Sequence, residues 1–266
     1  MSEDGMIHVV SFSTGELSAL ALERVISRYG AENTLPVFMD TLIEDDDNYR
    51  FSAQIEARFG IPFVKLADGR TPYEVSHDEH VIPNSRLAPC THRLKIEPFR
   101  AFLATLKNLV TVHIGYDFTE MHRCEATRKN YESLGYLVDF PMLWKPYEFR
   151  DYGTIIREEW GIEPPRMYAM GYTHANCGGC CVKQGQGDWI RTLINFPERY
   201  EKAEAWEREM RKNPINAEYA ILKDRTLGET KALTLQELRE RHERKQLPRL
   251  IELDVKSPCV VCGVGG

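Results

Sequence analysis

The segment that decides the fold starts at Ile7 and reads, through Arg28, IHVVSFSTGELSALALERVISR. Its first six residues contain a short apolar run, Ile7, Val9, Val10 and Phe12, that is typical of a buried strand, and Ser13-Thr14-Gly15 follows as a turn of small residues. From Leu17 to Val25, apolar residues recur at helical spacing. The segment therefore predicts a strand, a tight loop and a helix, with the loop amides and the helix N-terminus converging on a spot that favours an anion such as phosphate.

A second interpretation of the same turn stays open at this point. Ser13 and Glu16 have the Ser-x-x-Glu spacing of a capping box, which would close the start of the first helix. Such a cap does not exclude a nucleotide that shares the same amides.

The pattern of strand followed by helix continues along the chain. Further strands are predicted at residues 34–41, 62–67 and 109–114, and a helix is predicted to end near Phe59. This alternation indicates an α/β fold with a doubly wound parallel sheet, whose ligands bind at the carboxyl ends of the strands. Asp40 and Thr41 fall at such an end. The run Asp45-Asp46-Asp47 is expected to be a solvated first turn of a helix, favoured by the helix dipole.

Composition limits the function classes. The chain has 266 residues and a net charge of -6, which disfavours general affinity for nucleic acids or membranes. We find no signal peptide and no apolar run near the roughly 20 residues of a membrane span, so we expect a cytoplasmic protein. Its seven cysteines, odd in number and clustered, indicate metal, cluster or redox use rather than a disulfide framework.

A family resemblance starts at the first loop. Residues 11–18 resemble the Ser-Gly-Gly-Lys-Asp-Ser loop of the PP-loop ATP pyrophosphatases and the phosphoadenosine phosphosulfate (PAPS) reductases, and Ser13, Gly15 and Ser18 match that motif. Glu16 stands where the family has lysine and brings a negative charge toward the phosphate position. The resemblance implies that a nucleotide's phosphates lie in a cradle formed by Ser11, Ser13, Thr14, Gly15 and Ser18.

Three later segments extend the resemblance over about residues 7–190. Cys90-Thr-His-Arg-Leu-Lys-Ile-Glu-Pro98 is similar to the Cys-x-x-Arg-Lys-x-x-Pro segment of sulfonucleotide reductases, and Gly115 to Arg123 is similar to their Gly, Glu, Arg sequence. Residues 137–172 resemble the reductase run from Pro-Leu-x-x-Trp to Gly-Tyr. The resemblance implies that Asp40 and Gly115 border the nucleotide, that Arg93 and Arg123 neutralise an anionic substrate, and that Asp40 helps to place a magnesium ion if the substrate is ATP.

The cysteines form the densest chemistry in the chain. Residues 174–183 read HANCGGCCVK, in which Cys177 and Cys180 have Cys-x-x-Cys spacing and Cys177 and Cys181 have the Cys-x-x-x-Cys spacing of phage and mobile-element relatives of PAPS reductase. Paired glycines let such a loop fold tightly, so that several thiolates can converge on one metal or cluster. The isolated Cys124 is expected to be a small packed residue.

Two metal-site hypotheses remain open. In the first, which the family resemblance favours, Cys90, Cys177 and either Cys180 or Cys181 hold a 4Fe-4S cluster, whose fourth position is filled by a tail cysteine or left open for sulfur. In the second, Cys177, Cys180, Cys259 and Cys262 form a four-thiolate zinc site. A third role for the tail is catalytic: Cys262 lies in a sequence similar to the C-terminal Glu-Cys-Gly of thioredoxin-dependent PAPS reductases, where a thiolate attacks the sulfonyl sulfur.

These observations predict a nucleotide-binding α/β domain at residues 1–172 and a Cys-rich, helical C-terminal extension at residues 173–266. The predicted function is an adenine-nucleotide-binding enzyme of sulfur chemistry that performs ATP-dependent sulfur transfer. The alternatives are reduction of a sulfonucleotide (PAPS or APS) and a non-catalytic accessory role in a nucleoprotein complex of a phage or mobile element. The implied partners are a nucleotide substrate and a sulfur donor or thioredoxin-like reductant; a nucleic-acid acceptor and a homo-oligomer are left open.

Overall fold

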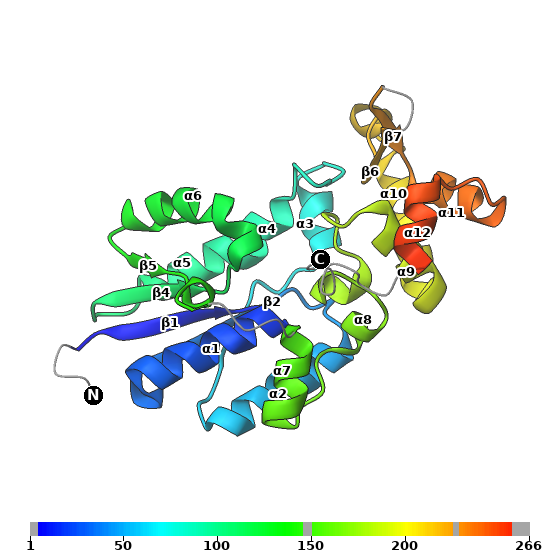
Figure 1. Ribbon diagram of the computed structural model, residues 1–266. Coiled ribbons are helices and arrows are strands. Elements are labelled where there is room, and N and C mark those ends of the chain that lie inside the picture. Colours follow the sequence, from blue (N-terminus) through cyan, green and yellow to red (C-terminus); the bar gives the residue numbers. More distant parts are fainter. Residues whose placement is uncertain (1–4, 146–150, 226–228, 257–266) are drawn as a thin grey trace. The chain divides into compact units, whose positions relative to one another are not determined.

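Strand β1 (Ile7–Phe12) is the central strand of a five-stranded parallel sheet, in agreement with the first stretch of sequence. In the computed structural model, which describes residues 5–145, 151–225 and 229–256, the strand order is β3-β2-β1-β4-β5 (Figure 1). The other strands are β2 (Thr34–Asp40), β3 (Val64–Ala67), β4 (Val110–Ile114) and β5 (Leu137–Asp139). Within β1, Val9 pairs with Leu35 of β2 and with Val112 of β4.

The order of the strands reverses beside β1. The chain passes from β1 to β2 and β3 on one side and then returns to β4 and β5 on the other side. In parallel sheets of this kind, the loops that follow the two strands at the reversal diverge and leave a crevice at their carboxyl ends. Here those two loops follow Phe12 and Ile114.

Helices cover both faces of the sheet, which confirms the predicted doubly wound α/β fold (Figure 1). Helices α1 (Glu16–Tyr29), α2 (Asp46–Phe59) and α7 (Tyr152–Trp160) pack on one face, and α5 (Glu97–Leu103) and α6 (Met121–Glu132) pack on the other. Neighbouring side chains of a strand point to opposite faces, so Val10 joins the first core and Val9 the second. Short helical turns are η1 (Ala31–Asn33), η3 (Phe118–Glu120) and η4 (Pro141–Leu143).

The chain divides into two compact units that alternate along the sequence. The first, which holds the sheet, consists of residues 1–40, 46–67 and 97–165; the second consists of residues 41–45, 68–96 and 166–266. The domain boundary that the sequence predicts after residue 172 stays a prediction. The second unit contains α3 (Pro72–Asp78), α4 (Pro89–Thr91), η2 (His92–Ile96), α8 (Arg166–Ala169), η5 (Asn176–Gly179), α9 (Gln186–Asn195), α10 (Pro197–Met210), η6 (Pro214–Asn216), β6 (Leu222–Asp224), β7 (Lys231–Leu233), α11 (Leu235–Glu243) and α12 (Arg249–Lys256).

The second unit has a core of its own, built around Trp189, Tyr200 and Leu238. Residues 69–94 contain helix α3, whose start is stabilised by a capping box between Thr71 and Glu74. The C-terminal part contains the antiparallel pair β6 and β7, although only helices are expected. Within the described ranges, no helix has the length and apolarity that crossing a membrane requires.

Candidate functional site

The first candidate site is the loop that follows β1. The Ser18 hydroxyl accepts a hydrogen bond from the Ser13 amide at 3.1 Å and donates to the Gly15 carbonyl oxygen at 2.8 Å. Thr14 has a φ of 62°, a left-handed conformation that is uncommon outside glycine, and its hydroxyl donates to the Ser13 carbonyl oxygen at 2.6 Å. Ser18 therefore shapes the loop from inside, while Ser13 is exposed. Ser11 lies within β1, between Val37 and Ile114.

The capping-box interpretation of this loop is wrong. Helix α1 begins at Glu16, so Gly15 is its N-cap, and no side chain caps it. Ser13 lies two residues before the N-cap, and Glu16 occupies the first helical position rather than the third, from which a carboxylate reaches back to the N-cap amide. Because no side chain takes the place of an anion there, the start of α1 keeps the partial positive charge of a helix N-terminus.

The loop after β4 meets the start of α1 at the reversal of strand order. A Cβ atom added to Gly115 would lie 3.1 Å from the Leu17 carbonyl oxygen and 3.3 Å from the Ser18 Cα atom. Glycine is thus the residue that allows the two loops to approach this closely. The geometry places Ser13, Gly15 and Gly115 at one end of the sheet, as expected. Asp40 ends β2, where its Oδ1 atom accepts a hydrogen bond from the Tyr49 hydroxyl at 2.8 Å.

Glu16 turns toward helix α7. A Cβ atom built on Gly153 would lie only 2.6 Å from Glu16 Oε1, so the carboxyl group covers this glycine. Burial raises the pKa of Glu16 to about 7; the negative charge of Asp151 acts in the same direction, and Arg157 opposes it. A group with this pKa is divided between its neutral and ionised forms near neutral pH, so the first turn of α1 does not carry a full negative charge there.

Arg123 lies in the same unit, beyond the loop after β4. Its guanidinium forms an ion pair with Glu120 and lies 4.2 Å from the centre of the Tyr116 ring. Asp117 is buried in this loop, where it accepts hydrogen bonds from the Thr119 amide at 2.8 Å and the Tyr152 hydroxyl at 3.0 Å. Asp117 thus has a structural role, while the predicted contact of Arg123 with an anionic substrate stays a prediction.

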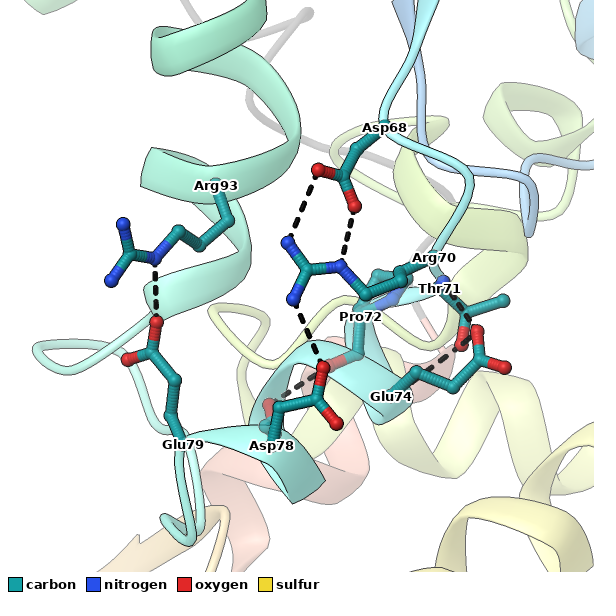
Figure 2. A network of polar contacts seen from close by, with 9 residues as sticks. Asp68, Arg70, Thr71, Pro72, Glu74, Asp78, Glu79 and Arg93 are labelled. Atoms are coloured by element: carbon teal, nitrogen blue, oxygen red, sulfur yellow. Dashed lines mark hydrogen bonds and ion pairs between the residues drawn. The ribbon is translucent and has the colours of Figure 1, made fainter.

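Arg93 belongs to the second unit and is engaged in an ion pair there. Its Nε atom lies 2.7 Å from Glu79 Oε1, and the side chain is half exposed (Figure 2). Next to it, Arg70 forms ion pairs with Asp68, which lies between β3 and α3, and with Asp78, the last residue of α3 (Figure 2). An anionic substrate at Arg93 would have to compete with the carboxylate of Glu79.

The second candidate site is the cysteine loop. Cys177, Gly178 and Gly179 have φ values of 53°, 56° and 82°, so three consecutive residues are left-handed. The two glycines adopt this conformation at little cost, whereas Cys177 is strained. A Cβ atom on Gly178 would lie 2.7 Å from the Ile43 carbonyl oxygen. The tight folding expected of the paired glycines is therefore confirmed.

The pKa values of Cys177 and Cys181 depend on each other. The Cys177 side chain lowers the pKa of Cys181 to about 6, and the positive charges of Lys95 and Lys183 contribute. The Cys181 side chain raises the pKa of Cys177 well above its ordinary value; burial and the charge of Glu44 add to this effect.

Residues from earlier in the chain surround Cys177 and Cys181. Glu44 Oε2 accepts a hydrogen bond from the Cys177 amide at 2.6 Å, and Glu44 Oε1 accepts one from the Thr41 hydroxyl at 2.9 Å. Burial alone would lower the pKa of Lys95, but negative charge at Glu44 and at the neighbouring cysteines, Cys177 foremost, raises it. Burial raises the pKa of Cys90, with a contribution from Cys181.

Cys180 has different surroundings from its neighbours. Its side chain belongs to the apolar core of the second unit, and burial raises its pKa to about 11. Its sulfur lies 3.9 Å from the Arg199 carbonyl oxygen. The third cysteine of the loop is thus a packed thiol. Cys124, in the first unit, is buried as expected.

In the acidic run Asp45-Asp46-Asp47, Asp46 and Asp47 lie in the first turn of α2 as expected and Asp46 is exposed, whereas Asp45 is not solvated. Asp45 is fully buried and accepts two hydrogen bonds from Arg166, both 2.8 Å long, and one from Arg199 at 2.7 Å. Arg199 also donates to the Gly178 carbonyl oxygen at 2.9 Å. Asp45 is buried because two arginines that lie more than a hundred residues away in the sequence neutralise it. It therefore helps to hold the cysteine loop.

The predicted metal sets fit the described residues only in part. Across residues 5–145, 151–225 and 229–256, no three His, Cys, Asp or Glu side chains are grouped so that they could hold a metal ion. Cys259 and Cys262 lie outside the described residues. The zinc set requires both of them, the cluster set can take a tail thiol from them, and the catalytic prediction concerns Cys262. Both metal sets therefore stay predictions.

No protein-family model matches the chain, and no curated protein sequence matches it. The resemblance to PAPS reductases therefore stays a prediction from the sequence.

Sequence reasoning missed Thr41, Glu44 and Lys95 as neighbours of the cysteine loop. Thr41 Oγ1 lies 4.0 Å from Cys177 Sγ, and Glu44 and Cys177 are 133 residues apart in the chain. Their own segments are ordinary: a strand end, an acidic turn and a basic helix start. No local signal in them indicates contact with a cysteine loop.

Proposed function

We propose that the protein is an adenine-nucleotide-binding enzyme of sulfur chemistry, as the resemblance to PAPS reductases implies. One observation carries the proposal: the uncapped N-terminus of α1 and its tight Ser13–Gly15 loop lie at the reversal of strand order, where Gly115 lets the loop after β4 reach the first turn of α1. Backbone amides that converge at such a point bind phosphate through hydrogen bonds and the helix dipole.

In this proposal, phosphate oxygens accept hydrogen bonds from the amides of the loop and the exposed Ser13 hydroxyl. Ser18 and Thr14 hold the loop in shape. Glu16 departs from the family lysine, but its carboxyl is turned toward Gly153 and is partly neutral near pH 7, which limits its repulsion of phosphate. The cysteine loop of the second unit supports the assignment to sulfur chemistry. We also propose that the protein works in the cytoplasm, where its thiols would stay reduced.

Calorimetric titration of the full chain with ATP, ADP and PAPS tests nucleotide binding. We expect one nucleotide per chain. Gly115→Val, whose side chain would press on the Leu17 carbonyl, should weaken binding at least tenfold. Val110→Ala is the matched control, because it removes volume from the buried amino end of the same strand without touching the loop. Absence of binding in the unaltered protein, or equal affinity in both variants, would contradict the proposal.

Analysis of the reaction products then distinguishes ATP-dependent sulfur transfer from sulfonucleotide reduction. ATP-dependent sulfur transfer should release pyrophosphate from ATP, and sulfonucleotide reduction should release sulfite from PAPS or APS when a thiol donor is present. We place the first reaction ahead because the loop resembles those of the ATP pyrophosphatases. Release of sulfite without consumption of ATP would reverse this order.

A specific observation also favours a non-catalytic accessory role. Glu16 takes the position of the lysine that the resembling families place beside the phosphates, and a carboxyl cannot neutralise developing negative charge as an ammonium does. Nucleotide binding without turnover of ATP, PAPS or APS would support this second function.

A further inference from the structure

Helix α12 is held against α9 by a buried arginine. Arg191 of α9 is 4% exposed, and its Nη2 atom donates to the backbone carbonyl of Asp254 in α12 and to the Asp254 carboxylate, the latter at 3.1 Å. Gly187, one turn earlier in α9, lies beneath the same carboxylate, so a Cβ atom on this residue would collide with Asp254 Oδ2. A buried charge with an oriented partner fixes where α12 can lie.

Behind this contact, Asp188 joins the two ends of the segment that contains the cysteine loop. Its Oδ1 atom accepts a hydrogen bond from Arg191 at 2.7 Å, and its Oδ2 atom accepts one from the Thr173 hydroxyl at 3.1 Å. Thr173 directly precedes the cysteine loop of residues 174–183, and Asp188 follows it. The buried carboxylate of Asp188 therefore closes the segment at its base, and Arg191 holds that carboxylate in place.

The next residue of α9 reaches the cysteine loop itself. The Thr192 hydroxyl donates to the Gly179 carbonyl oxygen, which also accepts a hydrogen bond from the Gln184 side chain at 2.6 Å. The first two turns of α9 thus support the cysteine loop both at its base and at one of its glycines. A shift of Arg191 would be transmitted to the loop through these neighbouring residues.

Little apolar surface holds α12 in place. Leu250 and Leu253 of this helix are 79% and 50% exposed, and Val255 packs at the edge of the core of the second unit. Helix α12 has only eight residues, too few to be stable without its contacts. Elements with little buried apolar surface are those that open at a small cost in free energy.

We propose that α12 is a reversible strap that keeps the cysteine loop closed and opens it on release, acting through Arg191 and Asp188. When α12 leaves, Arg191 retains N–H groups without an acceptor in a buried position and turns toward water. This movement draws Asp188 away from Thr173, so the base of the loop segment separates. The inference does not depend on the proposed nucleotide site, because every residue that it uses belongs to the second unit.

Hydrogen–deuterium exchange of the full chain, followed by peptide mass spectrometry, tests the strap. The probes are the backbone amides of residues 174–184, among which the Cys177 amide donates to Glu44 and the Gln184 amide to the Cys181 carbonyl oxygen. In Asp254→Asn these amides should exchange about tenfold faster, which corresponds to the loss of one hydrogen bond between charged groups. The amides of α10, a helix of the same core, should exchange at an unchanged rate.

Two matched pairs of variants separate the strap from general effects. Glu252→Gln removes a carboxylate from the same helix but leaves Asp254 in place, so it should not change exchange of the loop. Gly187→Ala displaces the strap by volume rather than by charge and should also speed exchange, although alanine favours the helix α9. Gly185→Ala, at the N-cap of α9 with open space around it, should not. If Asp254→Asn does not fold, the glycine pair still decides.

A double variant tests the route through Asp188. Thr173→Val breaks the hydrogen bond at the far end of this route and should speed exchange of the loop by itself. Combined with Asp254→Asn, it should accelerate exchange by less than the product of the two separate factors, because both changes act on the same closure. Multiplication of the two factors would overturn the route.

Three further results would overturn the strap itself. The first is unchanged exchange of residues 174–184 in Asp254→Asn and in Gly187→Ala. The second is an equal acceleration in α10, which would indicate that the whole core of the second unit has lost stability. The third is an equal acceleration of the loop in Glu252→Gln, which would mean that the charge of the helix matters and not the contact with Arg191.

Discussion

The imidazole Nδ1 atom of His8 lies 2.9 Å from Nε2 of His113, and both rings are buried where β1 and β4 run side by side. Tyr29 stacks on His8 with ring centres 3.6 Å apart, and Trp144 meets His113 edge to face. Because the bond joins one donor and one acceptor nitrogen, it needs at least one neutral ring. This pair makes the stability of the sheet sensitive to acid.

We expect the pair to destabilise the fold below pH 6.5. Burial lowers the pKa of His113 to about 4, and the charge of His8 adds to the effect. Since the folded pKa lies below the unfolded value of 6.5, the unfolded chain binds more protons between these two values. Stability is therefore present above pH 6.5 and is lost as the pH falls toward 4, by about 3 kcal/mol in all. Urea unfolding followed by circular dichroism across this range measures it in a Glu16→Gln background, where the opposite pH dependence of Glu16 is absent. In that background, His113→Gln should lose the acid dependence, and His122→Gln, at an exposed position, should keep it.

Glu16 should have the opposite dependence over nearly the same range. Burial raises its folded pKa to about 7 from 4.5, so the folded chain binds more protons between these values, and stability falls as the pH rises through them. The full effect is about 2 kcal/mol after allowance for its partial exposure. In the unaltered protein the two dependences largely cancel. Glu16→Gln should therefore stabilise the protein at pH 8 and reveal the His113 dependence. A variant with unchanged stability at both pH 5 and pH 8 would contradict this.

Replacement of the buried Asp45 should be costly. Asp45→Asn removes the carboxylate that Arg166 and Arg199 share; because the two arginine side chains are partly exposed and water can solvate them, we expect a loss of about 1–2 kcal/mol. Asp46→Asn, at the exposed neighbouring position, should change the free energy of unfolding by less than about 0.5 kcal/mol. Chemical denaturation of the two variants compares them directly. Equal stabilities would mean that Asp45 is solvated after all.

Alanine substitutions at Gly178 and Gly185 should differ in their effect on stability. Gly178→Ala must accept a φ of 56° and a Cβ atom 2.7 Å from the Ile43 carbonyl oxygen, so we expect a loss of about 2 kcal/mol or more. Gly185 has an ordinary φ of -81° and open space around its Cα, so Gly185→Ala should cost well under about 1 kcal/mol. The melting temperature should be clearly lowered in the first variant alone, and equal melting temperatures in the two variants would contradict this.

Local patterns were sufficient to predict four of the five strands of the sheet. Strands β1, β2, β3 and β4 and helices α1 and α2 lie where hydrophobic periodicity places them, because each depends on the spacing of apolar residues within one segment. One prediction failed because the same residues fit two different local structures. Ser13 and Glu16 have the spacing of a capping box, but the helix starts at Glu16 itself, and that start depends on how the loop folds around Ser18.

The sequence by itself determined the doubly wound sheet, the tight loop after β1 and the glycines that fold the cysteine loop, since these follow from side-chain periodicity and backbone freedom over a few residues. Only the tertiary structure decided that Cys180 enters the apolar core of the second unit, and that Glu44 and Asp45 support the cysteine loop. The partners of Asp45 are 121 and 154 residues away along the chain. Contacts over such separations depend on how whole elements pack, and no short stretch of sequence encodes them.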